Sequence, residues 1–154
     1  YNRAVVEPVM GFCTPEQYDS FMVQVPEFEH MLYESGTTIV KFWFSVNKEQ
    51  QLYRFNSRLK NPLKKWKYSP VDEKGQELWD EFTHYKDQMF SRTHNAFSPW
   101  VMVKANDKKQ ARLEAIRYVL SLFNYAGKEN AKVNLNPDPN IVQRYFRMAH
   151  QLDL

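Results

Sequence analysis

Two short apolar segments, set between stretches of helical pattern, constrain the fold of this chain more than any other sequence feature. Residues 37–46 (TTIVKFWFSV) are rich in β-branched and aromatic side chains and are mostly continuous rather than alternating in polarity. Such a run is typical of a strand buried on both faces, the kind found in parallel sheets covered by helices. The apolar residues 100–103 (WVMV) predict a second strand.

Helical patterns surround both predicted strands. Residues 14–17 (TPEQ) combine a capping threonine, a proline at the first helical position and a glutamine suited to a capping box. The helix that starts there is expected to kink or divide at Pro26 and to end at Gly36. Further helices are expected to start at Asn47 and to span about residues 72–89.

The last part of the sequence predicts two more helices. Asn106-Asp107 is a capping pair, and the helix after it has the clearest apolar stripe in the chain, formed by Leu113, Ile116, Leu120 and Phe123. The basic and aromatic segment 142–152 is expected to form a short helix. The order helix, strand, helix, helical insert, strand, helix predicts an α/β layered fold with a parallel sheet and flanking helices.

Two strands are too few for such a sheet, so we expect the rest of it to lie before Tyr1. The chain has four glycines, and no two of them lie within twenty residues of each other. Loops that cradle phosphate need clustered glycines, because backbone amides must approach the anion closely. The sequence therefore contains neither a Walker A loop nor a dinucleotide fingerprint.

Composition excludes several other classes of protein. The single cysteine, Cys13, permits no internal disulfide and no cysteine-rich zinc site, which favours a cytoplasmic setting. No 18-residue apolar run is present, so no membrane partner is expected. The net charge of +3 is mildly basic and is compatible with an anionic partner.

The strongest local feature is a basic segment, residues 54–67, which contains no acidic residue. Its six basic residues are Arg54, Arg58, Lys60, Lys64, Lys65 and Lys67. Arg54 and Arg58 are four residues apart, so both project from one helix face and can grip phosphate oxygens. The alternative is a solvated basic face, for which the nearby Asp72 and Asp80 serve only as caps or ion-pair partners.

The opening of the chain offers a second candidate group. Arg3 and Glu7 lie at helical spacing, so the simplest interpretation is an ion pair within a helix. A functional interpretation is that they hold a phosphate and a metal-bound water. The four histidines do not show the spacing of a metal site or of a catalytic triad.

Several blocks resemble the family 2 polyphosphate kinases, in order, from Tyr1 to about Phe123. They are YNRA and EPVMGFC at the start, KFWFS at 41–45, RFNSR and NPLKKWK at 54–67, and KANDKKQAR at 104–112. The first blocks resemble the segment just after the Walker B motif, and residues 54–67 resemble the lid. Val5, Asn61 and Tyr68 depart from the glycine, aspartate and leucine that are usual in the family.

The resemblance implies a P-loop kinase fold akin to thymidylate kinase, with a helical lid over about residues 54–98. Residues 1–123 would form the C-terminal part of the kinase domain, and residues 124–154 a tail to which it assigns no role. The Walker A and Walker B motifs would precede Tyr1, so the chain alone is expected to be inactive. The implied reaction is phosphoryl transfer between inorganic polyphosphate and ADP/ATP or GDP/GTP, with Mg²⁺ as cofactor, in a homo-oligomer.

The same resemblance implies a role for individual residues. Arg58 would be catalytic and would stabilise the charge of the transferring phosphoryl group. Asn2 and Arg3 would bind the phosphates of the nucleotide, and Glu7 would order a magnesium-bound water. The residues expected to bind polyphosphate are Arg54, Lys64, Lys65 and Lys67.

One alternative function belongs to a different class. Basic residues interleaved with Phe55, Trp66 and Tyr68 in residues 54–68 would suit a module that binds single-stranded nucleic acid. The basic residues are confined to about fourteen positions, whereas dedicated binders spread positive charge along a whole face. Nucleic acid is therefore not the expected partner.

Overall fold

The computed structural model describes residues 1–130 and 132–146, which divide into two compact units. The first unit, residues 1–39 and 47–98, is helical. The second unit joins residues 40–46 to the chain after Ser98 and contains the sheet. No helix in the described residues combines the length and the apolar character that crossing a bilayer requires.

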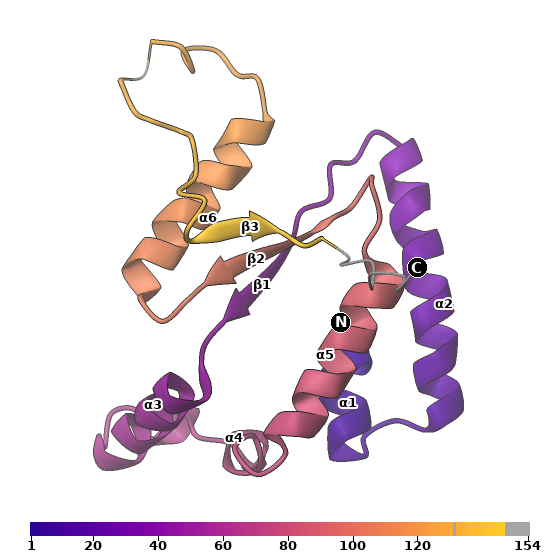
Figure 1. Cartoon of the computed structure of the whole chain (residues 1–154), viewed down its shortest axis with the longest axis vertical. Coiled ribbons are helices and arrows are strands. Elements are labelled where there is room, and N and C mark those ends of the chain that lie inside the picture. Colours follow the sequence, from indigo (N-terminus) through magenta and orange to yellow (C-terminus); the bar gives the residue numbers. More distant parts are fainter. Residues whose placement is uncertain (131, 147–154) are drawn as a thin grey trace, which may run out of the picture. The chain divides into compact units, whose positions relative to one another are not determined.

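The elements are shown in Figure 1. The first unit contains α1 (Asn2–Met10), α2 (Pro15–Glu34), α3 (Lys48–Lys60), the short 3₁₀ helix η1 (Lys65–Lys67), α4 (Pro70–Lys74) and α5 (Trp79–Thr93). The second unit contains β1 (Lys41–Ser45), β2 (Trp100–Lys104), α6 (Lys108–Leu122) and β3 (Val142–Arg144).

In the first unit, α1 packs against both α2 and α5 (Figure 1). The capping box predicted at the start of α2 is confirmed, since Thr14 and Gln17 exchange hydrogen bonds between side chain and backbone. The expected division at Pro26 is wrong, because α2 is one helix of 20 residues. A proline inside a helix costs about 3 kcal/mol or more, and the packing of α2 against α1 and α5 offsets this cost.

The helix expected over residues 72–89 is interrupted instead. α4 ends at Lys74 with Gly75 as its C-cap, and a series of turns separates it from α5. Glycine is a poor helix former, so it favours a break at this position. Gly75 is also buried, and a Cβ atom there would lie 3.3 Å from the carbonyl oxygen of Val71, so the site has little space for a larger residue.

The sheet of the second unit has the order β1-β2-β3. β1 and β2 are parallel, as predicted, with Lys41 opposite Trp100. Burial of β1 on both faces is wrong for the described residues, because Phe44 is 49% exposed and three other residues of the strand are only partly buried. β2, which lies between two strands, is the more buried of the two.

β3 runs antiparallel to β2 and places Val142 opposite Val103. A short helix over 142–152 was expected, so this strand is a correction for residues 142–144; residues 147–154 lie outside the described part. Backbone bonds extend the pairing, since Lys104 N–H donates to Ile141 O and Tyr145 N–H donates to Trp100 O, both at 2.9 Å. Pairing with β2 satisfies the backbone groups of a segment whose Ile, Val, Tyr and Phe residues favour a strand.

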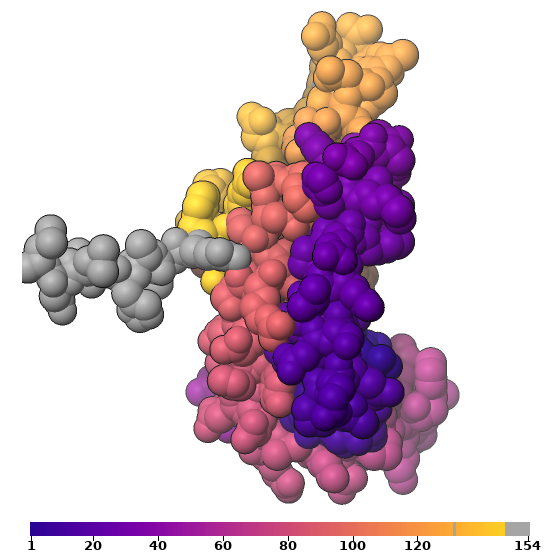
Figure 2. All heavy atoms as spheres, turned by 90° about the vertical axis from the view of Figure 1, so that its right-hand side faces the viewer, coloured from indigo at the N-terminus to yellow at the C-terminus, as the bar shows by residue number. Residues whose placement is uncertain are grey.

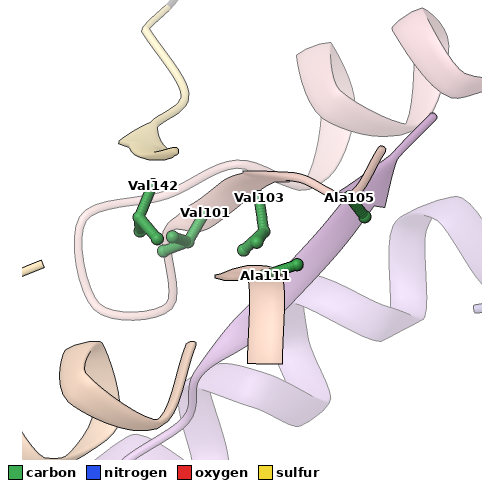
Figure 3. Packing of buried hydrophobic residues seen from close by; sticks show 5 residues of the cluster. All are labelled: Val101, Val103, Ala105, Ala111 and Val142. Carbon is green, nitrogen blue, oxygen red and sulfur yellow. The ribbon is translucent and has the colours of Figure 1, made fainter. Parts of the chain in front are cut away.

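The core of the second unit is small (Figure 3). It consists of Val101, Val103, Ala105, Ala111 and Val142. α6 is present as predicted, but it buries Ala111 and Ala115 rather than the larger apolar residues, and Leu113 and Ile116 are 48% and 57% exposed. Small side chains let the helix approach the strands closely, so the apolar stripe faces away from this cluster.

Candidate functional site

The first group of candidate residues lies on α1. Arg3 Nε donates to Glu7 Oε2 over 2.7 Å, which confirms the predicted ion pair within the helix. This single contact occupies one nitrogen of the guanidinium. The two terminal nitrogens of Arg3 and the second oxygen of Glu7 have no hydrogen-bond partner among the described residues. Asn2, at the start of the same helix, is exposed.

A hollow opens beside Arg3 on the surface of the first unit. It has a volume of about 290 Å³, and its lining residues are Arg3, Glu16, Gln17, Ser20, Phe21 and Gln24. One wall comes from α1 and the other from the first turns of α2. The guanidinium therefore borders an open recess whose other side chains are amide, hydroxyl and aromatic groups and the carboxylate of Glu16.

The second group lies on α3, the helix that begins at Asn47. The Asn47 side chain caps it by accepting from Gln50 N–H at 2.8 Å. Arg54 and Arg58 follow one helical turn apart. The Arg58 guanidinium lies 5.6 Å from the ring centroid of Phe55, which is buried, so a fixed aromatic side chain supports it from its own helix.

Arg58 is also held from a different element. Its Nη1 donates to Asp72 Oδ2 at 3.1 Å, and the two side chains are only 29% and 23% exposed. The same carboxylate oxygen accepts from Ser69 N–H at 3.2 Å, while Ser69 Oγ accepts from Asp72 N–H. Asp72 therefore both caps α4 and pairs with Arg58, so the two roles considered as alternatives occur together.

The turn that links α3 to η1 leaves its lysines open to solvent. Asn61 Oδ1 accepts from Leu63 N–H at 3.0 Å, and the backbone carbonyl of Asn61 accepts from Lys64 N–H and Lys65 N–H. These hydrogen bonds order the turn. The asparagine oxygen makes the contact that an aspartate oxygen would make, so this departure from the family pattern preserves the turn. Lys60, Lys64, Lys65 and Lys67 are exposed, and none has an ion-pair partner in the described part of the chain.

Trp66 lies in the middle of these lysines. Its Nε1–H donates to the carbonyl of Leu63 at 3.0 Å, while the residue is 77% exposed. The Lys67 ammonium lies 5.1 Å from the centroid of the indole ring. Trp66 therefore helps to fix the turn and at the same time presents an aromatic face beside a cation.

The candidate residues thus form two separate groups, one on α1 and one on α3 and the turn that follows it. No ion pair joins Arg3 or Glu7 to Arg58 within residues 1–130 and 132–146. The same residues contain no cluster of three or more histidine, cysteine, aspartate or glutamate side chains that could hold a metal ion. The signal for Asp72 was present in the sequence, as the first acid after the basic segment, but its pairing with Arg58 spans 14 residues and needs the fold.

Comparison with known proteins identifies a family over most of the chain. A family model described as Polyphosphate kinase 2 (PPK2) matches residues 1–131. The chain is 51% identical over 144 residues to NDP-polyphosphate phosphotransferase 2 of Ruegeria pomeroyi, which covers 94% of the chain and 42% of the relative. It is 50% identical over 151 residues to GDP-polyphosphate phosphotransferase of Pseudomonas aeruginosa, which covers 98% of the chain and 42% of the relative.

A solved structure extends the likeness to the fold. The crystal structure of polyphosphate kinase 2 from Arthrobacter aurescens TC1 matches with a TM-score of 0.72 and 28% identity, over 84% of this chain and 50% of that one. This likeness confirms the predicted α/β, P-loop kinase-like fold class. The chain spans less than half the length of the two relatives from Ruegeria and Pseudomonas, and no residue role follows from the likeness alone.

Proposed function

Because the chain belongs to the polyphosphate kinase 2 family, we propose that the protein that carries it transfers a terminal phosphoryl group between inorganic polyphosphate and a nucleoside diphosphate. The acceptors we propose are ADP and GDP. The observation that supports this best is the environment of Arg58. A half-buried guanidinium, held by Asp72, lies on the segment that carries four exposed lysines, none of which has an ion-pair partner among residues 1–130 and 132–146.

The chemistry needs few protein groups. An oxygen of the acceptor β-phosphate forms a bond to the terminal phosphorus as the phosphoanhydride bond of polyphosphate breaks, and the shortened chain leaves with the electron pair. Negative charge spreads over the transferring oxygens, so catalysis rests on positioning and charge stabilisation. Arg58 would donate hydrogen bonds to these oxygens, while Arg54, Lys64, Lys65 and Lys67 would line the path of the polyanion.

The acceptor nucleotide would bind at the other group. Two guanidinium nitrogens of Arg3 have no hydrogen-bond partner in the part of the chain that the structure describes, and Asn2 is exposed next to it. Both side chains can contact the phosphates of a diphosphate. Glu7 would keep the Arg3 side chain in place through the 2.7 Å bond to its Nε. The hollow beside Arg3 would receive another part of the nucleotide.

Magnesium, when bound, would neutralise phosphate charge. Mg²⁺ usually keeps several waters and takes one or two carboxylates together with substrate phosphates. In the described residues, Glu7 fits only an outer role of this kind, because one of its oxygens is paired with Arg3 and the other is open. Glu7 would thus accept from a metal-bound water rather than form a metal site.

The test is ATP formation from ADP, polyphosphate and MgCl₂ by the natural full-length protein. We expect ATP formation that depends on polyphosphate. We also expect polyphosphate of another chain length to compete for the polyphosphate site better than an oligonucleotide of equal charge. Absence of ATP from a folded full-length protein would overturn the proposal. Preference for the oligonucleotide would restore the nucleic-acid alternative, which the compared proteins do not support. The cytoplasmic setting, the homo-oligomer and the domain boundary at Phe123 stay predictions.

Lys67→Ala is expected to weaken polyphosphate binding rather than the chemical step. The ammonium is exposed and has no ion-pair partner among the described residues, so it is free to contact a phosphate. In nucleic acids, losing one phosphate contact lowers the slope of log affinity against log salt by about 0.7 to 0.9, and we expect a decrease of the same sign for polyphosphate. The measurement is the KM for polyphosphate at several salt concentrations. The matched control is Lys74→Ala, an exposed lysine on α4 outside the basic segment; equal effects of the two changes would contradict a specific role for Lys67.

A further inference from the structure

A buried carboxylate on α2, Glu29, belongs to neither group described above but is hydrogen-bonded to Tyr1, the residue next to Asn2. Glu29 is only 4% exposed, although α2 runs along the surface of its unit and has an open outer face (Figure 2). Its Oε1 accepts from the Tyr1 hydroxyl and its Oε2 accepts from the Ser98 hydroxyl, each at 2.6 Å. Ser98 is fixed in turn, because its N–H and its hydroxyl both contact Asn95 Oδ1 at 2.6 and 2.9 Å.

The burial of the Glu29 carboxyl group has an energetic cost. A buried carboxyl group is costly unless its oxygens accept hydrogen bonds, and an apolar residue at the same site would avoid the cost. Glu29 joins three segments that are far apart in sequence, since its partners lie 28 and 69 residues away. Burial, and then the hydrogen bond to Glu29, raise the pKa of the Tyr1 hydroxyl well above its usual value, so this group stays protonated and remains a donor.

Tyr1 contacts both the first turn of α1 and the side of α2. It directly precedes Asn2, the first residue of α1, and its own side chain makes no capping hydrogen bond to the helix. Its carbonyl oxygen accepts from Ala4 N–H at 3.0 Å and so begins the helix. Its ring also meets the edge of Phe21 on α2, with 5.8 Å between the ring centroids. Fixing the Tyr1 side chain therefore fixes the first turn of α1.

That first turn carries Asn2 and Arg3. The terminal nitrogens of Arg3 have no partner among the described residues, so the direction of its guanidinium depends on Glu7 and on the placement of the helix. A shift of about 1 Å in a positioning group can cost about 10²-fold in rate. An anchor on the residue that begins α1 is thus placed to control how Arg3 meets a ligand.

We propose that Glu29 is a positioning residue, which acts through Tyr1 to hold the first turn of α1 and so orients Asn2 and Arg3 toward the phosphates of the acceptor nucleotide. The inference rests on the proposed function for its choice of ligand. It assigns Glu29, Tyr1 and Ser98 a joint role that differs from substrate contact. Effects should therefore fall on the nucleotide and leave polyphosphate binding unchanged.

The test uses three variants in the full-length protein: Tyr1→Phe, Glu29→Gln and Glu29→Leu. Tyr1→Phe removes one hydroxyl and keeps the ring, and we expect a three- to tenfold rise in the KM for ADP with the KM for polyphosphate within twofold. The glutamine of Glu29→Gln can accept from one hydroxyl and donate to the other. We therefore expect the KM for ADP of Glu29→Gln to lie close to the wild-type value, and that of Glu29→Leu to be raised. Tyr33→Phe is the matched control, because Tyr33 is 52% exposed and its ring packs on Phe97.

Hydrogen exchange at the amides of residues 3–5 gives a second measurement that does not depend on activity. Faster exchange in Tyr1→Phe than in Tyr33→Phe, together with the selective rise in the KM for ADP, is the expected result. Unchanged exchange, or an equal rise in both KM values, would overturn the inference. A folded wild-type protein without phosphoryl transfer would overturn the proposed function and the acceptor role of Asn2 and Arg3. Hydrogen exchange would then still show whether the contacts of Glu29 with Tyr1 and Ser98 hold the first turn of α1.

Discussion

Arg58→Ala is expected to lower the kcat of the full-length protein by about 10³-fold, the range found when an arginine that stabilises transferring phosphoryl charge is removed. The physical reason is that the guanidinium can donate two hydrogen bonds in a fixed plane to phosphate oxygens. Its orientation is already set by Asp72 at 3.1 Å and by the ring of Phe55. The measurement is the initial rate of ATP formation at saturating ADP and polyphosphate.

Two further variants show whether this loss reflects geometry or charge. Arg58→Lys keeps the positive charge but loses the planar fork, so it should recover only a small part of the rate. Lys74→Ala removes an exposed positive charge from α4 and should leave kcat within twofold. A loss of less than tenfold in Arg58→Ala, or full recovery by lysine, would rule out direct stabilisation of the transferring group.

Features of this fold that depend on neighbouring residues were predictable from the sequence. The capping box at Thr14, the cap at Asn47 and the pair between Arg3 and Glu7 each involve residues three or four positions apart. The two parallel strands were also predictable, because continuous apolar runs of β-branched and aromatic residues have few other uses in a small domain. The family resemblance added the lid and the candidate roles.

Features that depend on distant partners were not predictable. β3 pairs with β2, which lies about 40 residues earlier in the chain, and the Ile, Val, Tyr and Phe residues of 141–146 favour a strand that the expected helix overlooked. α6 buries Ala111 and Ala115, and Ala111 packs in the core with Val101 and Val103, whereas periodicity alone favoured the face with Leu113. The Glu29 contacts span 28 and 69 residues, and a glutamate within an amphipathic helix reads as a solvated residue.

The same limit applies to the candidate site. Charge density in the sequence identified the basic segment, the spacing of Arg54 and Arg58 set the two arginines apart, and only the family resemblance distinguished Arg58. The structure separates them, since Arg58 is half-buried and paired whereas the lysines are exposed. A fixed cation is suited to a reacting group, and mobile exposed cations are suited to a long polyanion. Burial therefore supports the division between Arg58 and the lysines more strongly than composition did.

Asp72→Asn is expected to lower kcat about tenfold, which corresponds to about 1.4 kcal/mol of lost transition-state stabilisation. The asparagine oxygen can still accept from Ser69 N–H, so the cap of α4 is retained while the charge that holds Arg58 is lost. The effect on folding should be small, because a partly exposed ion pair contributes only about 0–1 kcal/mol. The measurements are kcat, both KM values and the free energy of unfolding in urea.

Ser69→Ala is the matched control for this prediction. It removes the hydroxyl that accepts from Asp72 N–H but leaves the carboxylate beside Arg58. Loss of such a cap costs about 1 kcal/mol of stability, and kcat should stay within twofold. The sign of the Asp72→Asn effect then decides between two physical models. A fall in kcat means that Asp72 holds Arg58 ready for the phosphoryl group, whereas a rise means that it competes with phosphate for the guanidinium and keeps the arginine away from its substrate.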